Sequence, residues 1–207
     1  MSLPYALIIA GGDGQRLGGV RKAELRIGGQ RLIDRVTARL GAVASPLLVA
    51  TGHGRLPPGD HIGVADLNAE FGGPLAGLAA AVDWLAARGI TNGLIASAAV
   101  DTPFLPQNFI ATMAQALGPH PAIFAAWGAA FYPPNALWQI SALAALPAQI
   151  RAGTAPKSLK ALLAEIGAAR QDWQPACPLD PFDNLNTLAD LIRLQRRAIA
   201  EQAEKLG

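Results

Sequence analysis

The chain has 207 residues, of which 51% are hydrophobic and 15% are charged, and its formal net charge is +2. This length is sufficient for one α/β domain with a sizeable core. The near balance of acidic and basic residues argues against a nucleic-acid partner or a membrane partner. We therefore predict a single domain over residues 1–207.

Cysteine usage and hydropathy bear on the compartment. Cys177 is the only cysteine, which excludes an internal disulfide and is typical of a reducing environment. No apolar run reaches the roughly 18 residues that a membrane span needs. The N-terminus also lacks the basic segment and apolar core of a secretory signal. These observations predict a cytoplasmic protein.

The first predicted strand, residues 5–10, runs directly into a glycine-rich loop. A short apolar run bounded by Pro4 and by glycines is typical of a buried parallel strand. Glycines let backbone N–H groups approach an anion, and arginine and lysine bind phosphate oxygens. We therefore predict a polyphosphate site that uses Arg16 and Lys22. The loop glycines are Gly11, Gly12, Gly14, Gly18 and Gly19.

This loop departs from two common phosphate-binding motifs. Lys22 is followed by Ala23, which cannot serve a magnesium ion as the serine or threonine of a P-loop does. Gly12 and Gly14 are followed by Leu17, where the dinucleotide fingerprint requires glycine. A dinucleotide-dependent oxidoreductase is therefore the weakest hypothesis. A flexible surface loop with incidental charges is the alternative without function.

Strand and helix patterns alternate along the rest of the chain. Apolar spacing predicts helices over residues 32–40, 75–87, 109–117, 135–144 and 159–166. Apolar runs predict further strands over residues 47–50, 62–66, 93–100 and 121–126, with an edge strand at 131–134. This alternation predicts an α/β fold: a single doubly wound, mostly parallel sheet with helices on both faces.

Two helices invite more detailed predictions. In the helix over residues 32–40, Asp34, Arg35 and Arg39 fall on the face that we expect to be solvated. A last helix begins after Asn186 or Thr187, because either residue can cap it and Asp190 stands three residues beyond Thr187. The charges of this last helix are also expected to face solvent.

Candidate ligand-binding residues follow the predicted strands. Residues 51–61 form a Gly- and Pro-rich loop of the kind that lines ligand crevices in open α/β sheets. Gly73 and Pro74 open a helix whose first amides would face that crevice, and Gly77 would leave room for a base or ribose. A plain helix N-terminus is the alternative for this segment.

Asp101 stands just past a predicted central strand, where a metal and a triphosphate would meet. Mg²⁺ prefers one or two carboxylates together with waters and phosphate oxygens. We therefore predict that Asp101 binds Mg²⁺. The alternative is that Asp101 only begins the turn before Pro103.

Four blocks of the sequence, in this order, resemble the molybdenum cofactor guanylyltransferases of the nucleotidyltransferase superfamily. They are residues 9–22, Asp66 with residues 73–77, residues 101–105 and residues 184–191. The resemblance implies the doubly wound nucleotidyltransferase fold, with GTP and molybdopterin or molybdenum cofactor as substrates and Mg²⁺ as cofactor. It implies transfer of GMP to the pterin phosphate, with release of pyrophosphate.

The resemblance also implies roles for individual residues. Lys22 would meet the phosphates, Asp101 would bind magnesium, and Asn184 and Asn186 would lie on the pterin side. Arg16 and Lys22 would offset charge on the leaving phosphates, which makes them catalytic together with Asp101. The other nucleotide-binding positions are Ile9, Ala10, Gly11, Gly12, Thr51, Asp66, Gly73, Pro74, Leu75 and Gly77.

Two positions depart from the family pattern. Members often carry an acidic residue before the loop lysine, where this chain has Arg21, and an asparagine after the second strand, where it has Thr51. A threonine cannot offer the paired amide that an asparagine presents to a base. The nucleotide therefore stays open between GTP and CTP, and another phosphorylated acceptor stays open as well.

The predicted reaction needs no general base, because the attacking phosphate oxygen is already an anion. Catalysis would consist of positioning and charge neutralisation. A nucleotide-binding protein or cofactor carrier that transfers nothing is the competing hypothesis. For the charged last helix, the second interpretation is a surface for transient contact with cofactor-accepting enzymes or chaperones.

Overall fold

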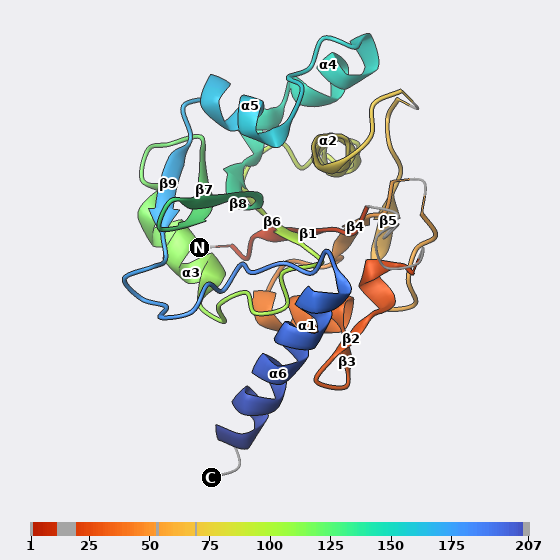
Figure 1. Cartoon of the computed structure of the whole chain (residues 1–207). Helices are drawn as coiled ribbons and strands as arrows, with labels where there is room; N and C mark the ends of the chain where they lie inside the picture. Colours follow the sequence, from red (N-terminus) through yellow and green to blue (C-terminus); the bar gives the residue numbers. More distant parts are fainter. Residues whose placement is uncertain (1, 12–19, 53, 69, 205–207) are drawn as a thin grey trace.

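The computed structural model describes residues 2–11, 20–52, 54–68 and 70–204. A seven-stranded sheet of order β5-β4-β1-β6-β8-β7-β9 forms the centre of the molecule (Figure 1). Within the described part of this sheet, every neighbouring pair of strands that excludes β8 is parallel. The predicted mostly parallel sheet is therefore confirmed.

β1 (Tyr5–Ile9) lies between β4 (Leu48–Ala50) and β6 (Leu94–Ala99). Its residues are nearly all buried, as a central parallel strand covered on both faces requires. β5 (Ile62–Val64) ends the sheet on the β4 side. On the β6 side follow β8 (Ala130–Gln139), β7 (Ala122–Trp127) and β9 (Ala169–Asp172).

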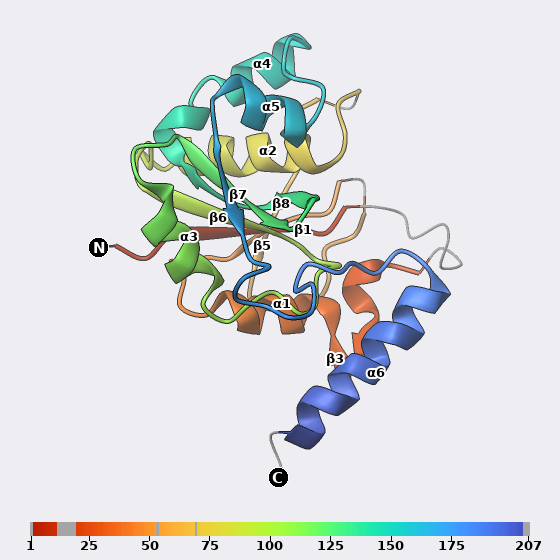
Figure 2. The same ribbon diagram turned by 60° about the vertical axis from the view of Figure 1, so that its left-hand side comes forward.

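Helices cover both faces of this sheet, as predicted (Figure 2). One face carries α2 (Pro74–Ala86), α4 (Leu146–Ala152) and α5 (Leu159–Glu165). The other face carries α1 (Leu32–Leu40) and α3 (Phe109–Leu117), and α6 (Leu188–Glu204) extends from this side. The shorter elements are the 3-10 turns η2 (Lys22–Glu24) and η3 (Ile140–Leu143) and the hairpin of β2 (Arg26–Ile27) and β3 (Gln30–Arg31).

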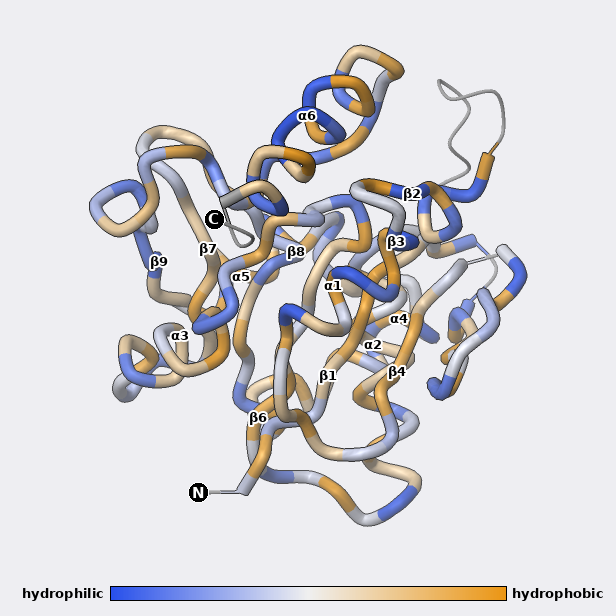
Figure 3. Tube along the Cα trace, turned by 90° about the horizontal axis from the view of Figure 1, so that it is seen from below, coloured by the Kyte–Doolittle hydropathy of each residue, from blue (hydrophilic) through white to orange (hydrophobic). Residues whose placement is uncertain are grey.

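Each face of the sheet buries its own apolar core. Along β1, Ala6 and Ile8 pack into the core beneath α1, whereas Leu7 and Ile9 pack into the core beneath α2. This is the two-residue alternation of a strand. In Figure 3, hydrophobic residues run along β1, β4 and β6, whereas α6 has mixed hydropathy. In the described part of the chain, no helix has the length and apolar character to cross a bilayer.

The helix predicted over residues 135–144 is wrong, because this segment continues β8 and ends in η3. The misreading has a physical cause: β8 is buried on both faces, so its apolar run lacks the alternation of a half-buried strand. Residues 131–134 were predicted to form an edge strand, but β8 lies between β6 and β7. Pro133 and Pro134 are tolerated there because the register with β7 shifts at this point.

Arg35 and Arg39 do not lie on a solvated face, contrary to the prediction. Arg35 is only 6% exposed, and the two guanidinium groups donate to Glu201 of α6 at 2.7 and 2.8 Å. The periodicity of residues 32–40 cannot reveal this burial, because the covering helix comes from the other end of the chain. Asp34 is exposed, as predicted.

The predicted cap of the last helix is confirmed. Asp190 N donates to Thr187 Oγ1 at 3.2 Å, and Thr187 N donates to Asp190 Oδ2 at 2.9 Å. Sequence patterns did not predict α4 or β9. β9 is a polar strand at the edge of the sheet, with the sequence ARQD, and carries no apolar pattern.

Gly77 lets α2 approach the sheet closely. A Cβ atom at this position would lie 2.6 Å from the Cβ atom of Ala50 in β4. The expectation that Gly77 leaves room for a base or ribose is therefore wrong, because Ala50 fills that space. The small residue is needed for packing of helix on sheet.

We expect Gly77→Ala to lower the free energy of unfolding by about 1–2 kcal/mol in urea denaturation. The overlap with Ala50 costs about 1–3 kcal/mol and outweighs the roughly 1 kcal/mol that alanine gains in helix propensity. The matched control is the same change in an Ala50→Gly background, where the obstructing methyl group is absent. An equal loss in both backgrounds would contradict the packing argument.

Candidate functional site

The carboxyl ends of β1 and β6 lie side by side. The two strands pair in parallel from Tyr5 opposite Ile95 to Ile9 opposite Ala99, and Val100 N donates to Ile9 O at 3.0 Å. A pocket of about 160 Å³ opens at this edge. Its described lining consists of Ile9, Gly11, Lys22, Pro74, Ala99, Val100, Asp101, Thr102, Tyr132, Pro134, Asn135 and Asn184.

This pocket brings together predicted positions from all four blocks of the resemblance, although Asp66 itself is not among its described lining residues. In the described part of the chain, those that line it are Ile9, Gly11, Lys22, Pro74, Asp101 and Asn184. The predicted positions Gly12 and Arg16 lie outside the described residues, as do Gly14, Gly18 and Gly19. The two ends of the glycine-rich loop, Gly11 and Lys22, therefore face Asp101 in one pocket.

Lys22 connects three distant segments of the chain at the pocket. Its Nζ donates to Asp101 Oδ2 at 2.8 Å and to Asn186 Oδ1 at 2.6 Å. Asn186 Nδ2 in turn donates to Asn184 Oδ1 at 3.0 Å. The side chains of Lys22 and Asp101 are only 15% and 18% exposed, so water screens their ion pair weakly.

The hydrogen-bond inventory of this cluster leaves capacity for an anion. A lysine ammonium has three donors, and Lys22 uses two of them on Asp101 and Asn186. Among the described residues no acceptor is bonded to the third donor, which can meet a phosphate oxygen without breaking either bond. Leu185 N donates to Asp101 O at 3.0 Å, which fixes the segment of both asparagines against the end of β6.

The start of α6 holds the asparagines in place through Asp190. This carboxylate accepts the backbone N–H groups of Asn186 and Thr187 and the Thr187 hydroxyl, at 3.1, 2.9 and 2.8 Å. Burial alone raises the pKa of Asp190, but these hydrogen bonds and the charge of Lys22 outweigh it, and the pKa lies below its usual value. The anionic cap is therefore retained at neutral pH.

Asn135 is a pocket residue that sequence reasoning missed, because its segment was predicted to be helical. It is 1% exposed, and its Oδ1 accepts Ala99 N at 2.9 Å. Main-chain pairing between β6 and β8 reaches only Ser97 opposite Ala136. The side chain of Asn135 thus adds one hydrogen bond between β8 and β6 beyond the last backbone pair. This bond positions the turn that carries Asp101.

Tyr132 also enters the pocket from β8. Its hydroxyl donates to Asp180 Oδ2, and its ring lies 5.2 Å from that of Phe182. Burial and then the bond to Asp180 raise the pKa of Tyr132 above its usual value, so the phenol stays protonated at neutral pH. Tyr132 can therefore shape the pocket but cannot act as a base.

Thr51 lies beside Gly11 and Asp66 lies beside Gly52, and neither is among the described residues that line the pocket. A Cβ atom at Gly11 would be 3.7 Å from the backbone of Thr51, and one at Gly52 would be 3.8 Å from Asp66 Oδ2. Thr51 Oγ1 donates to Gly54 O at 2.8 Å. Since this bond uses the hydroxyl proton, Thr51 has only acceptor capacity left for a base.

The remaining predicted positions cluster around β1 and the start of α2. Ala10 N donates to Ala50 O at 2.8 Å, which extends β1 toward the pocket. Gly73 has a φ of +86°, which favours glycine. Leu75 is 4% exposed and belongs to the core beneath α2, so only its backbone can face a ligand.

We expect Asn135→Val to raise the exchange rate of the Ala99 amide by about ten-fold or more. The valine leaves that buried N–H without its acceptor, which costs about 1–3 kcal/mol. Hydrogen exchange followed by NMR gives the readout. Asn135→Asp keeps an acceptor oxygen and is the matched control; unchanged protection in the valine variant would contradict the positioning role.

A family model described as "MobA-like NTP transferase domain" matches residues 6–171. The chain is 38% identical over 188 residues to a molybdenum cofactor guanylyltransferase of Acidiphilium cryptum, covering 90% of this chain and 91% of that protein. It is 33% identical over 199 residues to a protein of the same name from Nitrobacter hamburgensis, with 93% of each chain covered.

Solved structures share the fold at lower identity. One is the molybdopterin-guanine dinucleotide biosynthesis protein A from Archaeoglobus fulgidus, with a TM-score of 0.70, 20% identity and coverage of 95% of this chain and 99% of that one. Another is the 2-C-methyl-D-erythritol 4-phosphate cytidylyltransferase from Thermus thermophilus, with a TM-score of 0.68, 19% identity and coverage of 96% and 100%. Both confirm the nucleotidyltransferase fold.

Proposed function

Because the chain belongs to the MobA-like NTP transferase family, we propose that it acts as a single nucleotidyltransferase domain over residues 1–207. It transfers GMP from GTP to the phosphate of molybdopterin or molybdenum cofactor, and the products are molybdopterin guanine dinucleotide and pyrophosphate. The observation that carries the proposal is the convergence of Lys22, Asp101 and Asn186 at the end of β1 and β6.

The donor set of the pocket is compatible with Mg²⁺. Asp101 is the carboxylate in its described lining, and the described residues contain no cluster of three or more acidic, histidine or cysteine side chains that could hold a metal. One carboxylate, completed by phosphate oxygens and water, is a usual ligand set for Mg²⁺. We propose that Asp101 holds the ion. When bound, it would offset the negative charge of the triphosphate.

The proposed chemistry is an in-line displacement at the α-phosphorus of GTP. A phosphate oxygen of the acceptor forms the new P–O bond, and the bond from the α-phosphorus to the oxygen that bridges to the β-phosphate breaks. The bonding electrons leave with pyrophosphate. The attacking oxygen is already an anion, and the described lining of the pocket contains no histidine that would serve as a base.

The chain's own residues then have two tasks. The Lys22 donor that bonds to no described residue, together with the proposed contact of Arg16, neutralises charge on the phosphates that leave. Asn184 and Asn186 lie on the acceptor side, and their bonds to each other and to Lys22 couple acceptor binding to the phosphate site. Holding both substrates in line supplies most of the expected acceleration.

The nucleotide-binding surface comprises the end of β1 and the start of α2. Pro74 and the backbone of Ile9 to Gly11 line or border the pocket. Thr51 lies beside Gly11, and Asp66 lies beside Gly52. We propose that the base lies against this surface, with Gly73 and Leu75 contributing their backbone and Gly12 extending it along the loop. We do not include Gly77 in this surface, because the side-chain position of Gly77 lies against Ala50.

Cytidylyl transfer is the second candidate. The hydroxyl proton of Thr51 is used in the bond to Gly54 O, so its side chain offers a base only an acceptor and cannot make the paired contact of an asparagine amide. A panel of GTP, CTP and ATP with molybdopterin and Mg²⁺, read as pyrophosphate release, distinguishes the two. GTP is expected to be the preferred donor; equal or faster release from CTP would overturn the guanylyl assignment while leaving nucleotidyl transfer intact.

Two further features are proposals from the sequence. We propose a cytoplasmic location and a transient contact of this protein with cofactor-accepting enzymes or chaperones. The proposal of a cytoplasmic location rests on Cys177, which is the single cysteine and has a free thiol.

We expect Asp101→Asn to lower kcat for pyrophosphate release by about 10²-fold or more, because a preorganised charge at the reacting phosphates is worth that much. Asparagine is isosteric with aspartate, so the variant should fold, and its urea midpoint measures the cost of losing the ion pair with Lys22. Asp34→Asn removes an exposed carboxylate of α1 and serves as the control. Near-normal turnover of the Asp101 variant would remove this residue from the mechanism.

We expect Lys22→Gln to weaken binding of GTP by about ten-fold or more and binding of GMP by much less, because a charged hydrogen bond to the β- or γ-phosphate is lost. Isothermal titration with each nucleotide measures both affinities. Lys157→Gln, at an exposed lysine, is the control. Equal losses for the two nucleotides would place Lys22 away from the outer phosphates.

A further inference from the structure

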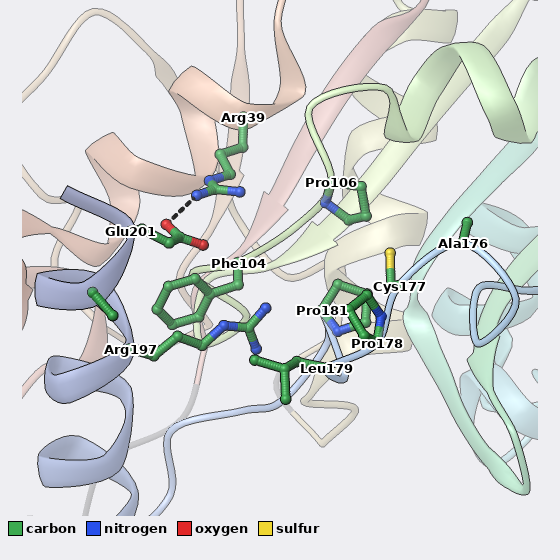
Figure 4. Close-up of a pocket in the computed structure, with 11 residues that line it drawn as sticks. Arg39, Phe104, Pro106, Ala176, Cys177, Pro178, Leu179, Pro181, Arg197 and Glu201 are labelled. Atoms are coloured by element: carbon green, nitrogen blue, oxygen red, sulfur yellow. Dashed lines mark hydrogen bonds and ion pairs between the residues drawn. The ribbon is translucent and has the colours of Figure 1, made fainter. Parts of the chain in front are cut away.

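A second and larger hollow lies beneath α6, away from the residues of the ligand pocket. Its volume is about 400 Å³. Figure 4 shows that α6 forms one wall, while the segment of Phe104 and Pro106 and the proline-rich segment of Cys177 to Pro181 form the others. None of its described lining residues belongs to the pocket of Asp101.

Three arginines converge on one aromatic ring at this hollow. The guanidinium carbons of Arg35, Arg39 and Arg197 lie 4.7, 5.8 and 4.1 Å from the centre of the Phe104 ring. Among the described residues, Glu201 is the carboxylate that forms ion pairs with this group, with Arg35 at 2.7 Å and Arg39 at 2.8 Å. The Asp180 carboxylate also attracts Arg197 from beyond ion-pair distance, so three positive charges meet two negative charges and leave an excess of one.

Arg197 carries the least compensated of these charges. No carboxylate in the described part of the chain lies within ion-pair distance of it, and its Nη1 donates to the main-chain oxygen of Asp180 at 2.6 Å. The side chain lines the hollow (Figure 4) and is partly buried. A guanidinium has five N–H donors, so most of the donors of Arg197 remain for a ligand.

Packing alone does not account for the cluster. Stacking on Phe104 favours a cation, but a second and third cation at the same ring repel the first. Burial and then the like charge of Arg39 lower the pKa of Arg35, and burial also lowers the pKa of Arg197. A phosphate anion in the hollow would reduce this repulsion and offset the excess positive charge.

We propose that this hollow is a binding site for a phosphate group, held by Arg197 and Arg39. The forked guanidinium groups match the spacing of phosphate oxygens. The apolar walls of Pro106, Leu179 and Pro181 suit an uncharged remainder of a small organic phosphate. The proposal does not depend on the proposed nucleotidyl transfer, and it assigns phosphate binding but no reaction to this hollow.

Two contacts link this site to the ligand pocket. Arg197 holds the backbone of Asp180, and the Asp180 carboxylate accepts the hydroxyl of Tyr132, which lines the pocket. A phosphate bound to Arg197 is therefore connected to the ligand pocket through two hydrogen bonds, Arg197 to Asp180 and Tyr132 to Asp180. Occupancy of the hollow would reach the pocket through the position of Tyr132.

Isothermal titration with inorganic phosphate and with phenyl phosphate, at constant ionic strength set by sodium chloride, tests the proposal on the full chain. Lys22→Gln should retain binding, which separates the hollow from the ligand pocket. Arg197→Gln should weaken binding by about ten-fold or more, through loss of charged hydrogen bonds. Arg196→Gln removes the same charge from an exposed position one residue away and should bind like the unchanged protein.

A second variant keeps the test decisive if Arg197→Gln does not fold. Leu179→Glu adds a negative charge at a lining residue that is 61% exposed, and Leu188→Glu adds it at a residue of α6 that is 63% exposed. Only the Leu179 variant should weaken phosphate binding. The site would be overturned if Arg197→Gln or Leu179→Glu bound phosphate as tightly as the unchanged protein does. It would also be overturned if titration with phosphate released no more heat than titration with sodium chloride. Tighter binding of phenyl phosphate than of phosphate supports an organic ligand, and equal binding supports inorganic phosphate.

Discussion

The ion pair of Lys22 with Asp101 is the contact on which the organisation of the candidate site depends. It joins the end of the glycine-rich loop to the end of β6, and the bond from Lys22 to Asn186 adds the segment before α6. These three segments are remote in sequence, so only the folded sheet brings them together. An anionic ligand at this point meets a lysine that is already oriented and partly shielded from water, which lowers the entropy cost of binding.

Sheet topology explains why these residues meet. β1 and β6 are parallel neighbours, so the residues that follow them emerge at the same edge. β8 runs in the opposite direction beside β6, and its first half therefore reaches that edge as well. Tyr132 and Asn135 enter the pocket by this route. A single antiparallel strand thus contributes side chains that a purely parallel sheet would place at its other end.

Sequence patterns predicted the features that depend on local chemistry. The buried first strand, the carboxylate past β6 and the Thr187–Asp190 cap each have a short-range signal, and these elements lie where they were expected. Asn135 and Arg35 were misread because their surroundings are set by segments far away in the chain. β8 is buried by two neighbouring strands, and Arg35 by Glu201 of the last helix. No window of residues around either position contains that information.

The most direct test of the account is a double-mutant cycle on Lys22 and Asp101, with pyrophosphate release from GTP in the presence of Mg²⁺ and molybdopterin as the readout. If the two side chains act as one unit at the phosphates, the variant with both Lys22→Gln and Asp101→Asn loses little more activity than the worse single variant. Losses that multiply would show that the two residues act independently, and would contradict the shared site from which the rest of the interpretation follows.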